Sequence, residues 1–129
     1  MSLTALDLPA EALRKYHPQE ALRRRKAKMR AELSERRRLA NLTCRKAAKL
    51  LRGHFGAKEV TLFGSLARRG GFTLFSDIDL AVRGLPSERF FEAVGAVTGL
   101  SAEFRIDLIE LETCPPALLR KIEEYGKAL

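Results

Sequence analysis

The chain has 129 residues, 46% of them hydrophobic and 31% charged, a balance that predicts one globular domain. No apolar run approaches the roughly 18 residues of a membrane-spanning helix, so we expect no membrane span and no membrane partner. The first residues lack the pattern of a signal peptide, and Cys44 and Cys114 lie far apart, as expected for reduced thiols in the cytoplasm.

The formal net charge of +8 is concentrated near the N-terminus. Residues 11–53 contain 15 Lys or Arg and four Glu, a net charge of +11, so the rest of the chain carries −3. This uneven charge says nothing about the fold, but it indicates what kind of partner the chain could have. A clustered basic segment attracts anionic surfaces.

The N-terminal third is predicted to be helical. Residues 1–9 are expected to form a loose lead-in, and residues 10–16 a short helix that ends before Pro18. Residues 19–52 contain no Gly or Pro and many good helix formers, which predicts one long helix. Such a helix spans about 50 Å, more than the width of a domain of this size.

The two halves of this helix differ in pattern. In the second half, small and apolar residues recur at a helical spacing that predicts a face packed on a sheet: Ala40, Cys44, Ala47 and Leu51. In the first half, only Leu22, Met29 and Leu33 form a thin apolar stripe among clustered arginines and lysines. We therefore predict a basic helical N-terminal arm over residues 1–38 and a second domain over residues 39–129.

The remaining sequence alternates between strands and short helices. Strands are predicted at 59–63, 78–82 and 103–111, and helices at 65–69, 87–98 and 115–124. Ser87 and Thr113 are expected to cap the last two helices. The order of elements indicates an α/β (α+β) fold, with a small β-sheet flanked by helices.

The most informative stretch is residues 60–82. An apolar run ends at Gly64 and Ser65, and a second apolar run carries Asp77 and Asp79 two positions apart. Residues i and i+2 of a strand share a face, so these carboxylates project together, about 7 Å apart at the backbone. Two anions held this close are suited to a divalent cation.

The turn at Gly64 supplies a second feature of the same site. A strand that stops at a glycine and turns into a helix directs backbone N–H groups at open space, and Ser65 adds a hydroxyl donor. Together with the helix dipole these groups form a seat for a phosphate. A phosphate seat beside a pair of metal-binding carboxylates indicates phosphoryl or nucleotidyl transfer.

Gly64-Ser65, eleven intervening residues and Asp77-Ile78-Asp79 resemble the signature of the DNA polymerase β-type nucleotidyltransferase superfamily, in particular its minimal nucleotidyltransferases. These proteins carry a third carboxylate on a later strand, where this chain has Asp107. The resemblance covers about residues 39–129. It implies a polymerase β-like fold with a small mixed sheet, to which the long basic N-terminal helix is an addition.

The resemblance implies a Mg²⁺-dependent transfer of a nucleotidyl group, AMP from ATP or another NTP, to a hydroxyl acceptor. Asp77, Asp79 and Asp107 would be the catalytic residues and the ligands of two Mg²⁺ ions. Gly64 and Ser65, together with Arg69, would bind the phosphates of the nucleotide. Each carboxylate also has an ordinary alternative, as part of a turn at a strand end or as a surface residue.

The acceptor and the partner are open at this point. Minimal nucleotidyltransferases often pair with a HEPN-type helical protein in toxin–antitoxin systems and modify a tyrosine of the toxin, so the resemblance implies a HEPN-type partner. The first alternative is a non-catalytic antitoxin or assembly module with a transferase fold. In the second, the basic arm binds nucleic acid, although residues 19–52 contain no aromatic residue for base stacking. The same arm could instead join a partner, or a second copy of the chain, through Leu22, Met29 and Leu33.

Overall fold

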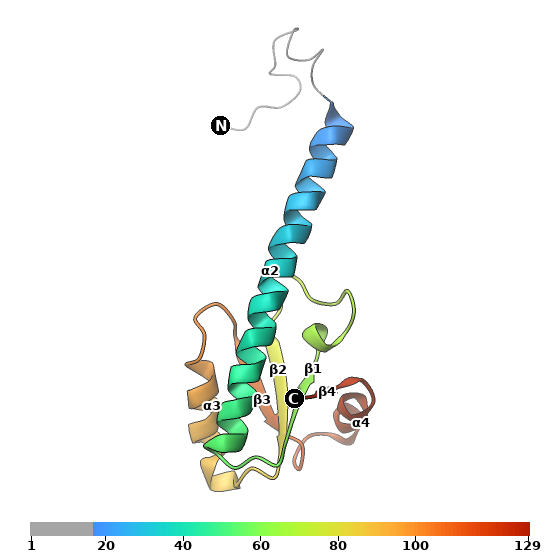
Figure 1. The fold of residues 1–129 in the computed structure, drawn as a ribbon. Coiled ribbons are helices and arrows are strands. Elements are labelled where there is room, and N and C mark those ends of the chain that lie inside the picture. The colour runs from blue at the N-terminus through green and yellow to red at the C-terminus, as the bar shows by residue number, and fades with distance from the viewer. Residues whose placement is uncertain (1–16) are drawn as a thin grey trace. The chain divides into compact units, whose positions relative to one another are not determined.

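The computed structural model describes residues 17–129, so the expectations for residues 1–16 lie outside the described residues. The chain divides into two compact units, Met1–Glu32 and Leu33–Leu129. The long helix predicted from the sequence is confirmed as α2 (Pro18–Gly53), which contributes to both units (Figure 1). No helix of the described residues is long and apolar enough to cross a membrane.

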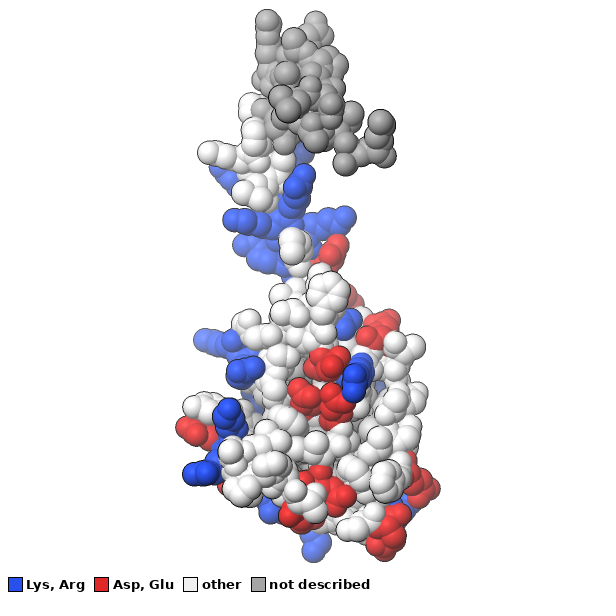
Figure 2. Space-filling view, turned by 180° about the vertical axis from the view of Figure 1, so that it is seen from behind, with Lys and Arg blue, Asp and Glu red and all other residues white. Residues whose placement is uncertain are grey.

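The described part of the first unit is the basic half of α2. Figure 2 shows Lys and Arg crowding this segment. Its six basic residues between positions 23 and 30 are Arg23, Arg24, Arg25, Lys26, Lys28 and Arg30. Arg24 donates a hydrogen bond to Glu20 one turn away, at 2.7 Å, and the apolar side chains of Leu22 and Met29 are half or more exposed.

The second unit is built on a mixed sheet of four strands, which confirms the expected small mixed sheet and includes the three predicted strands. Its strands are β1 (Glu59–Phe63), β2 (Ile78–Arg83), β3 (Ile106–Glu110) and β4 (Lys127–Ala128), in the order β3-β2-β1-β4. β2 is antiparallel to β1 and parallel to β3, and β4 is antiparallel to β1. The two-residue strand β4 was not predicted from the sequence, since so short a segment carries no alternating pattern.

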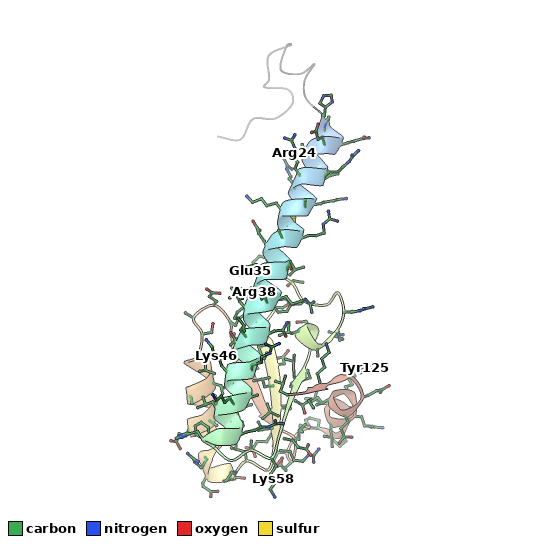
Figure 3. The ribbon with its side chains drawn as sticks, in the orientation of Figure 1. Arg24, Glu35, Arg38, Lys46, Lys58 and Tyr125 are labelled. Atoms are coloured by element: carbon green, nitrogen blue, oxygen red, sulfur yellow. The ribbon has the colours of Figure 1, made fainter. Side chains whose placement is uncertain are left out.

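One face of the sheet is covered by the second half of α2 and by α3 (Phe90–Thr98), which lie on the same side in Figure 1. The predicted helix face is confirmed, since its four residues are fully buried: Ala40, Cys44, Ala47 and Leu51. Burial raises the pKa of the Cys44 thiol to about 11, so this cysteine is a packing residue at neutral pH. The opposite side of α2 is exposed, and Arg38 donates to Glu35 there at 2.6 Å (Figure 3).

The other face of the sheet carries a smaller core under α4 (Pro116–Tyr125). Ala81 of β2 and Ile122 of α4 are buried in it, and Phe63 and Leu118 pack against them. Because α4 covers only part of this face, the acidic side chains of β2 and β3 next to it stay partly exposed. The two faces are therefore packed to different degrees.

Two helix starts differ from the sequence prediction. The segment after Gly64 is a single 3-10 turn, η2 (Ser65–Ala67), and the chain leaves it in an extended conformation at Arg68. A second 3-10 turn, η3 (Ser87–Arg89), precedes α3. The predicted caps Ser87 and Thr113 make no side-chain cap. At α4 the N-cap is Pro115, whose side chain has no hydrogen-bond acceptor, and Pro116 follows at the first helical position.

β3 is shorter than the predicted strand 103–111. Its first paired residue is Ile106, which lies opposite Ile78, the first residue of β2. The residues before Ile106 have no β2 residue to pair with in this register, except that Ile78 N–H donates to the Arg105 carbonyl at 2.9 Å. The length of the neighbouring strand, and not the local apolar pattern, therefore sets where β3 begins.

Candidate active site

The structure brings the three predicted aspartates to one face of the sheet. Asp79 of β2 and Asp107 of β3 are direct partners in the parallel register, which places their backbones about 4.8 Å apart. Asp77 immediately precedes β2, two positions before Asp79. All three side chains are partly exposed. Figure 2 shows acidic side chains gathered in the middle of the face opposite the one seen in Figure 1.

The three carboxylates repel one another in the absence of a cation. Burial, and after it the negative charges of Asp107 and Asp77, raise the pKa of Asp79 above its ordinary value. Asp107 has a basic neighbour, because the Arg105 Nε lies 3.2 Å from its Oδ1. Arg105 is mostly exposed, so this pair compensates only weakly for the charge of the cluster.

The donor set suits Mg²⁺ by its chemistry. Mg²⁺ prefers carboxylate oxygens and keeps several waters, so a few aspartates are sufficient to hold it. Within residues 17–129, no three His, Cys, Asp or Glu side chains are already grouped as a set of metal ligands. Burial first, and then the charges of Asp107 and Asp77, raise the pKa of Asp79, and a bound cation would lower it again.

Gly64 ends β1 immediately beside Asp79. Its φ of +76° is a conformation that residues with a side chain rarely adopt. A Cβ atom at this position would collide with Asp79 Oδ2. The absent side chain therefore lets the turn pass next to the carboxylate. η2 is only one turn long, so the helix dipole expected at this turn is missing, and a phosphate here would have only the backbone and the Ser65 hydroxyl as partners.

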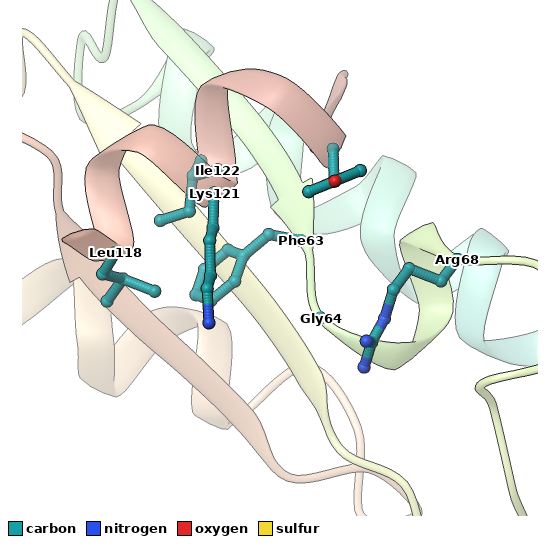
Figure 4. Close-up of a pocket in the computed structure, with 7 residues that line it drawn as sticks. Phe63, Gly64, Arg68, Leu118, Lys121 and Ile122 are labelled. Atoms are coloured by element: carbon teal, nitrogen blue, oxygen red, sulfur yellow. The ribbon is translucent and has the colours of Figure 1, made fainter.

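A cavity of about 300 Å³ opens between the end of β1 and α4 (Figure 4). Its lining residues are Phe63, Gly64, Arg68, Leu118, Lys121, Ile122 and Tyr125. The three aspartates do not line the cavity themselves, but Phe63 lies directly opposite Asp79 in the β1–β2 register, so the cavity comes next to the acidic cluster at Asp79. Apolar surface therefore faces one side of the acidic cluster, and two basic side chains stand at its margin.

The α4 residues of this cavity were missed by sequence reasoning, although a signal exists. Leu118, Lys121, Ile122 and Tyr125 recur at i, i+3, i+4 and i+7, so they form one face of the helix. The pattern marks a helix face that packs on something. It does not say that a cavity remains beside the packed residues.

The structure separates the other predicted residues. Gly64 lines the cavity together with Arg68, whereas Arg69 is not among its lining residues. Among the phenylalanines on either side of the Gly64 turn, Phe63 lines the cavity. Phe72 is buried in the larger core, and Phe75 is 92% exposed.

Comparison with known proteins agrees with this geometry. The family model described as "Polymerase beta, Nucleotidyltransferase" matches residues 45–129. A chain in a crystal structure of a mutant of the toxin–antitoxin MntA-HpeT is 29% identical, with a TM-score of 0.54, and the match covers 66% of this chain and 69% of that one. A chain in a crystal structure of "the toxin-antitoxin with AMP-PNP" is 27% identical, with a TM-score of 0.56 and coverages of 66% and 70%.

A third similar chain comes from a rebuilt structure of the tri-AMPylated Shewanella oneidensis HEPN toxin in complex with MNT antitoxin. It is 26% identical, with a TM-score of 0.52, and the match covers 69% of this chain and 70% of that one. The comparison with curated protein sequences gives no significant match. The family match spans most of the chain and includes every predicted site residue. The chain therefore belongs to the polymerase beta nucleotidyltransferase family, as a minimal nucleotidyltransferase.

Proposed function

We propose that this nucleotidyltransferase moves AMP from ATP to a hydroxyl group on a HEPN-type partner protein, and that the reaction depends on Mg²⁺. The observation that carries the proposal is that the cavity lies next to the acidic cluster. Phe63 and Gly64 line the cavity, and both are direct neighbours of Asp79. A nucleotide held in the cavity has its phosphates within reach of the acidic cluster. Fold alone would not support a function, but this arrangement does.

Asp77, Asp79 and Asp107 are the residues that would hold the metal, and we propose two Mg²⁺ ions shared among them. Bound Mg²⁺ supplies positive charge that polarises the α-phosphate and neutralises the charge that develops on it. The pKa of Asp79 is raised by burial and by the charges of Asp107 and Asp77, and these carboxylates would repel one another less with a cation between them.

The transfer step itself is a displacement at phosphorus. The acceptor hydroxyl oxygen attacks the α-phosphorus, and the bond from this phosphorus to the bridging oxygen of the β-phosphate breaks. Pyrophosphate leaves with the electron pair, and Asp107 accepts the hydroxyl proton. Asp107 is on β3, the strand at the edge of the sheet away from the cavity, so we place the acceptor on that side.

The choice of a HEPN-type partner and of AMP is supported by the similar structures. All three are toxin–antitoxin structures; one of them contains AMP-PNP, and another contains a tri-AMPylated HEPN toxin. We further propose that the basic segment over residues 1–38 serves partner recognition and residues 39–129 the catalysis. In this scheme the nucleotide fills the cavity beside α4. The acceptor would therefore be recognised by the surface between this chain and its partner.

The direct test is transfer of label from ATP labelled at the α-phosphate, with Mg²⁺, to a HEPN-type protein encoded in the same genome. We expect label on a hydroxyl side chain, located by mass spectrometry, and none with Asp79→Asn. Nucleotide binding without any transfer to that partner would contradict the proposal and favour the non-catalytic binding module. Retained neutralisation of the partner by a folded Asp79→Asn variant would point the same way.

A further inference from the structure

The outer side of β3 is an open edge of the sheet. β3 is the first strand in the order β3-β2-β1-β4, so it has a neighbouring strand on one side only. In a parallel pair, alternate residues of a strand bond the neighbouring strand. The Ile78 N–H donates to the Arg105 carbonyl, which fixes the alternation: the odd-numbered residues of β3 bond β2. The N–H groups of Ile106, Leu108 and Glu110 therefore point away from the sheet.

Most of these outward backbone groups have no partner. Within residues 17–129, the Glu110 carbonyl accepts a hydrogen bond from the Thr113 N–H at 3.4 Å, and no backbone group bonds the outward side of Ile106 or Leu108. An unpaired strand edge is a template for a further strand, and proteins usually cover or blunt it. β3 contains no proline, and its register with β2 is unbroken. The edge is therefore suited to pairing with an extended segment of another chain.

A hollow of about 340 Å³ follows this edge. Its lining comes from both faces of the sheet, with Phe90 and Leu108 from the α3 side and Ile109 and Leu118 from the α4 side. A hollow lined from both faces lies at the edge itself. Phe91, whose ring centre is 6.0 Å from that of Phe90, is 84% exposed. Apolar side chains thus stand on both sides of the edge, where they would cover the side chains of an added strand.

An added strand would place one of its side chains beside Asp107. The backbone groups of Asp107 turn toward β2, and its side chain lies on the face of the acidic cluster. Opposite such a residue, the Cα atom of an antiparallel strand is only about 4.5 Å away, and the two side chains share one face. A hydroxyl side chain at that position lies next to the carboxylate that takes its proton in the proposed transfer.

We propose that the open edge of β3 binds the acceptor as an extended segment of the partner protein, with the modified hydroxyl residue opposite Asp107. The proposal rests on the proposed function, since it assigns the acceptor of the same site. The residues next to the hydroxyl residue then face the α3 side, where Phe90 and Phe91 favour apolar side chains. A second copy of this chain fits less well, because antiparallel pairing of two β3 edges would bring two acidic clusters together.

The test uses Glu110→Pro, with Glu110→Gln as its matched control. Proline removes the outward N–H and places its ring on the edge, and it breaks no bond to β2 because the Glu110 N–H makes none in this register. Glutamine removes the same charge and keeps the N–H. Transfer of label from ATP to the HEPN-type protein would be measured at varied concentrations of each substrate. We expect Glu110→Pro to raise the KM for the partner about tenfold, the loss of one hydrogen bond, with the KM for ATP unchanged and the control like the wild type.

Hydrogen exchange gives a second readout, which needs no variant. In the free wild-type chain, the amides of Ile106 and Leu108 should exchange faster than those of Asp107 and Ile109, which bond β2. Binding of the partner in the presence of Mg²⁺ and a non-hydrolysable ATP analogue should slow exchange at Ile106 and Leu108 by at least about tenfold. Unchanged exchange at these two amides in a complex that forms would overturn the proposal.

Failure of this inference is distinguishable from failure of the proposed function. If the wild type labels the partner and Glu110→Pro does so with the same KM, the edge is not the acceptor site and the transfer stands. If the wild type labels no partner, the proposed function and this inference are both wrong. An equal rise in KM for Glu110→Gln would assign the effect to the charge and overturn the pairing. Dimers of the free chain that Glu110→Pro abolishes in light scattering would assign the edge to a second copy instead.

Discussion

The two faces of the sheet use alternate residues of the same strands for opposite purposes. On β2, Ile78, Leu80 and Val82 are fully buried under α2 and α3. The neighbouring Asp79 points to the other face, where its carboxylate meets those of Asp77 and Asp107. One face gathers most of the apolar core, and the other collects repelling charge beside a cavity. The first face thus supplies the stability that the second one lowers.

This division shows what a chain of this size requires to hold an active site. Apolar burial is the main favourable contribution to the folding of such a domain. The net free energy of folding is nevertheless small, because conformational entropy opposes it. A cluster of carboxylates costs part of it, and groups held in unfavourable surroundings are typical of functional sites. Substitutions on the two faces should therefore affect different quantities, which the following predictions use.

The largest expected effect is on stability, from Leu80→Ala on the buried face. Leu80 is completely buried, so truncation should lower the free energy of unfolding by about 2–5 kcal/mol. Urea unfolding would measure it. Nucleotide affinity of the folded protein should be nearly unchanged, because Leu80 faces away from the carboxylates. A loss of nucleotide binding as large as the loss in stability would contradict the separation of the two faces.

Asp79→Asn, one residue before Leu80, should have the opposite effect: it should lower activity and leave stability intact or increase it. An amide is a poor Mg²⁺ ligand, so nucleotidyl transfer should fall at least about 100-fold. The melting temperature of the metal-free protein at neutral pH should rise, because the repulsion with Asp107 and Asp77 disappears. Glu92→Gln on the exposed surface of α3 serves as the control for loss of a negative charge. A variant with both lower stability and full activity would refute the assignment.

The pH dependence of stability follows from the same carboxylate. The pKa of Asp79 is raised in the folded protein, so the unfolded chain releases this proton at lower pH than the folded chain does. The stability of the metal-free protein should therefore fall as the pH rises from the ordinary Asp pKa of 3.8 through the raised value. Urea midpoints across this range, for wild type and Asp79→Asn, would measure it. Identical slopes in the two proteins would be the contrary result.

Gly64→Ala tests the close approach between the turn and the carboxylate. The positive φ of Gly64 and the collision of a Cβ with Asp79 Oδ2 should together cost about 1–3 kcal/mol of stability and displace Asp79. We expect transfer to fall by at least about tenfold, because a small displacement of a metal ligand is costly. Gly95→Ala is the matched control, since a Cβ there meets no atom within 4 Å and the site is helical. Comparable activity in the two variants would contradict the account.

The smallest effect is expected where α2 contacts the loop before Asp77. The Arg36 guanidinium lies 4.4 Å from the centre of the Phe104 ring, and Nη2 is 3.5 Å from the Ser76 carbonyl. Arg36→Met should lower the free energy of unfolding by about 1 kcal/mol. Arg38→Met, which removes only an exposed pair with Glu35, should leave the urea midpoint nearly unchanged. Equal effects of the two variants on the urea midpoint would remove this contact from the account.

The acidic half of the site was predictable from the sequence because the positions of Asp77, Asp79 and Gly64 follow from residues close to them in the chain. Asp77 and Asp79 share a face through the two-residue period of a strand, and Gly64 marks a turn at the end of the strand before. The partnership of Asp79 with Asp107 depends on the parallel register of β2 and β3. Composition does not fix that register, and the family resemblance supplied the expectation.

The cavity half was not predictable in the same way. Lys121 and Tyr125 become site residues only because α4 packs over β1 and leaves a space beside Phe63. The preference for Arg68 over its neighbour Arg69 as a cavity residue follows from where the single turn of η2 ends. The role of the α4 residues and the choice between Arg68 and Arg69 depend on tertiary packing. The sequence alone does not distinguish such neighbouring residues.

The most direct test of the central claim is a calorimetric titration with a non-hydrolysable ATP analogue, with and without Mg²⁺. It would compare the wild type with the double variant Asp77→Asn and Asp79→Asn. The account predicts Mg²⁺-dependent binding to the wild type that the folded double variant loses. Binding of equal strength in both proteins, or no binding to either, would contradict the assignment of the carboxylates and the adjoining cavity as a nucleotidyl-transfer site.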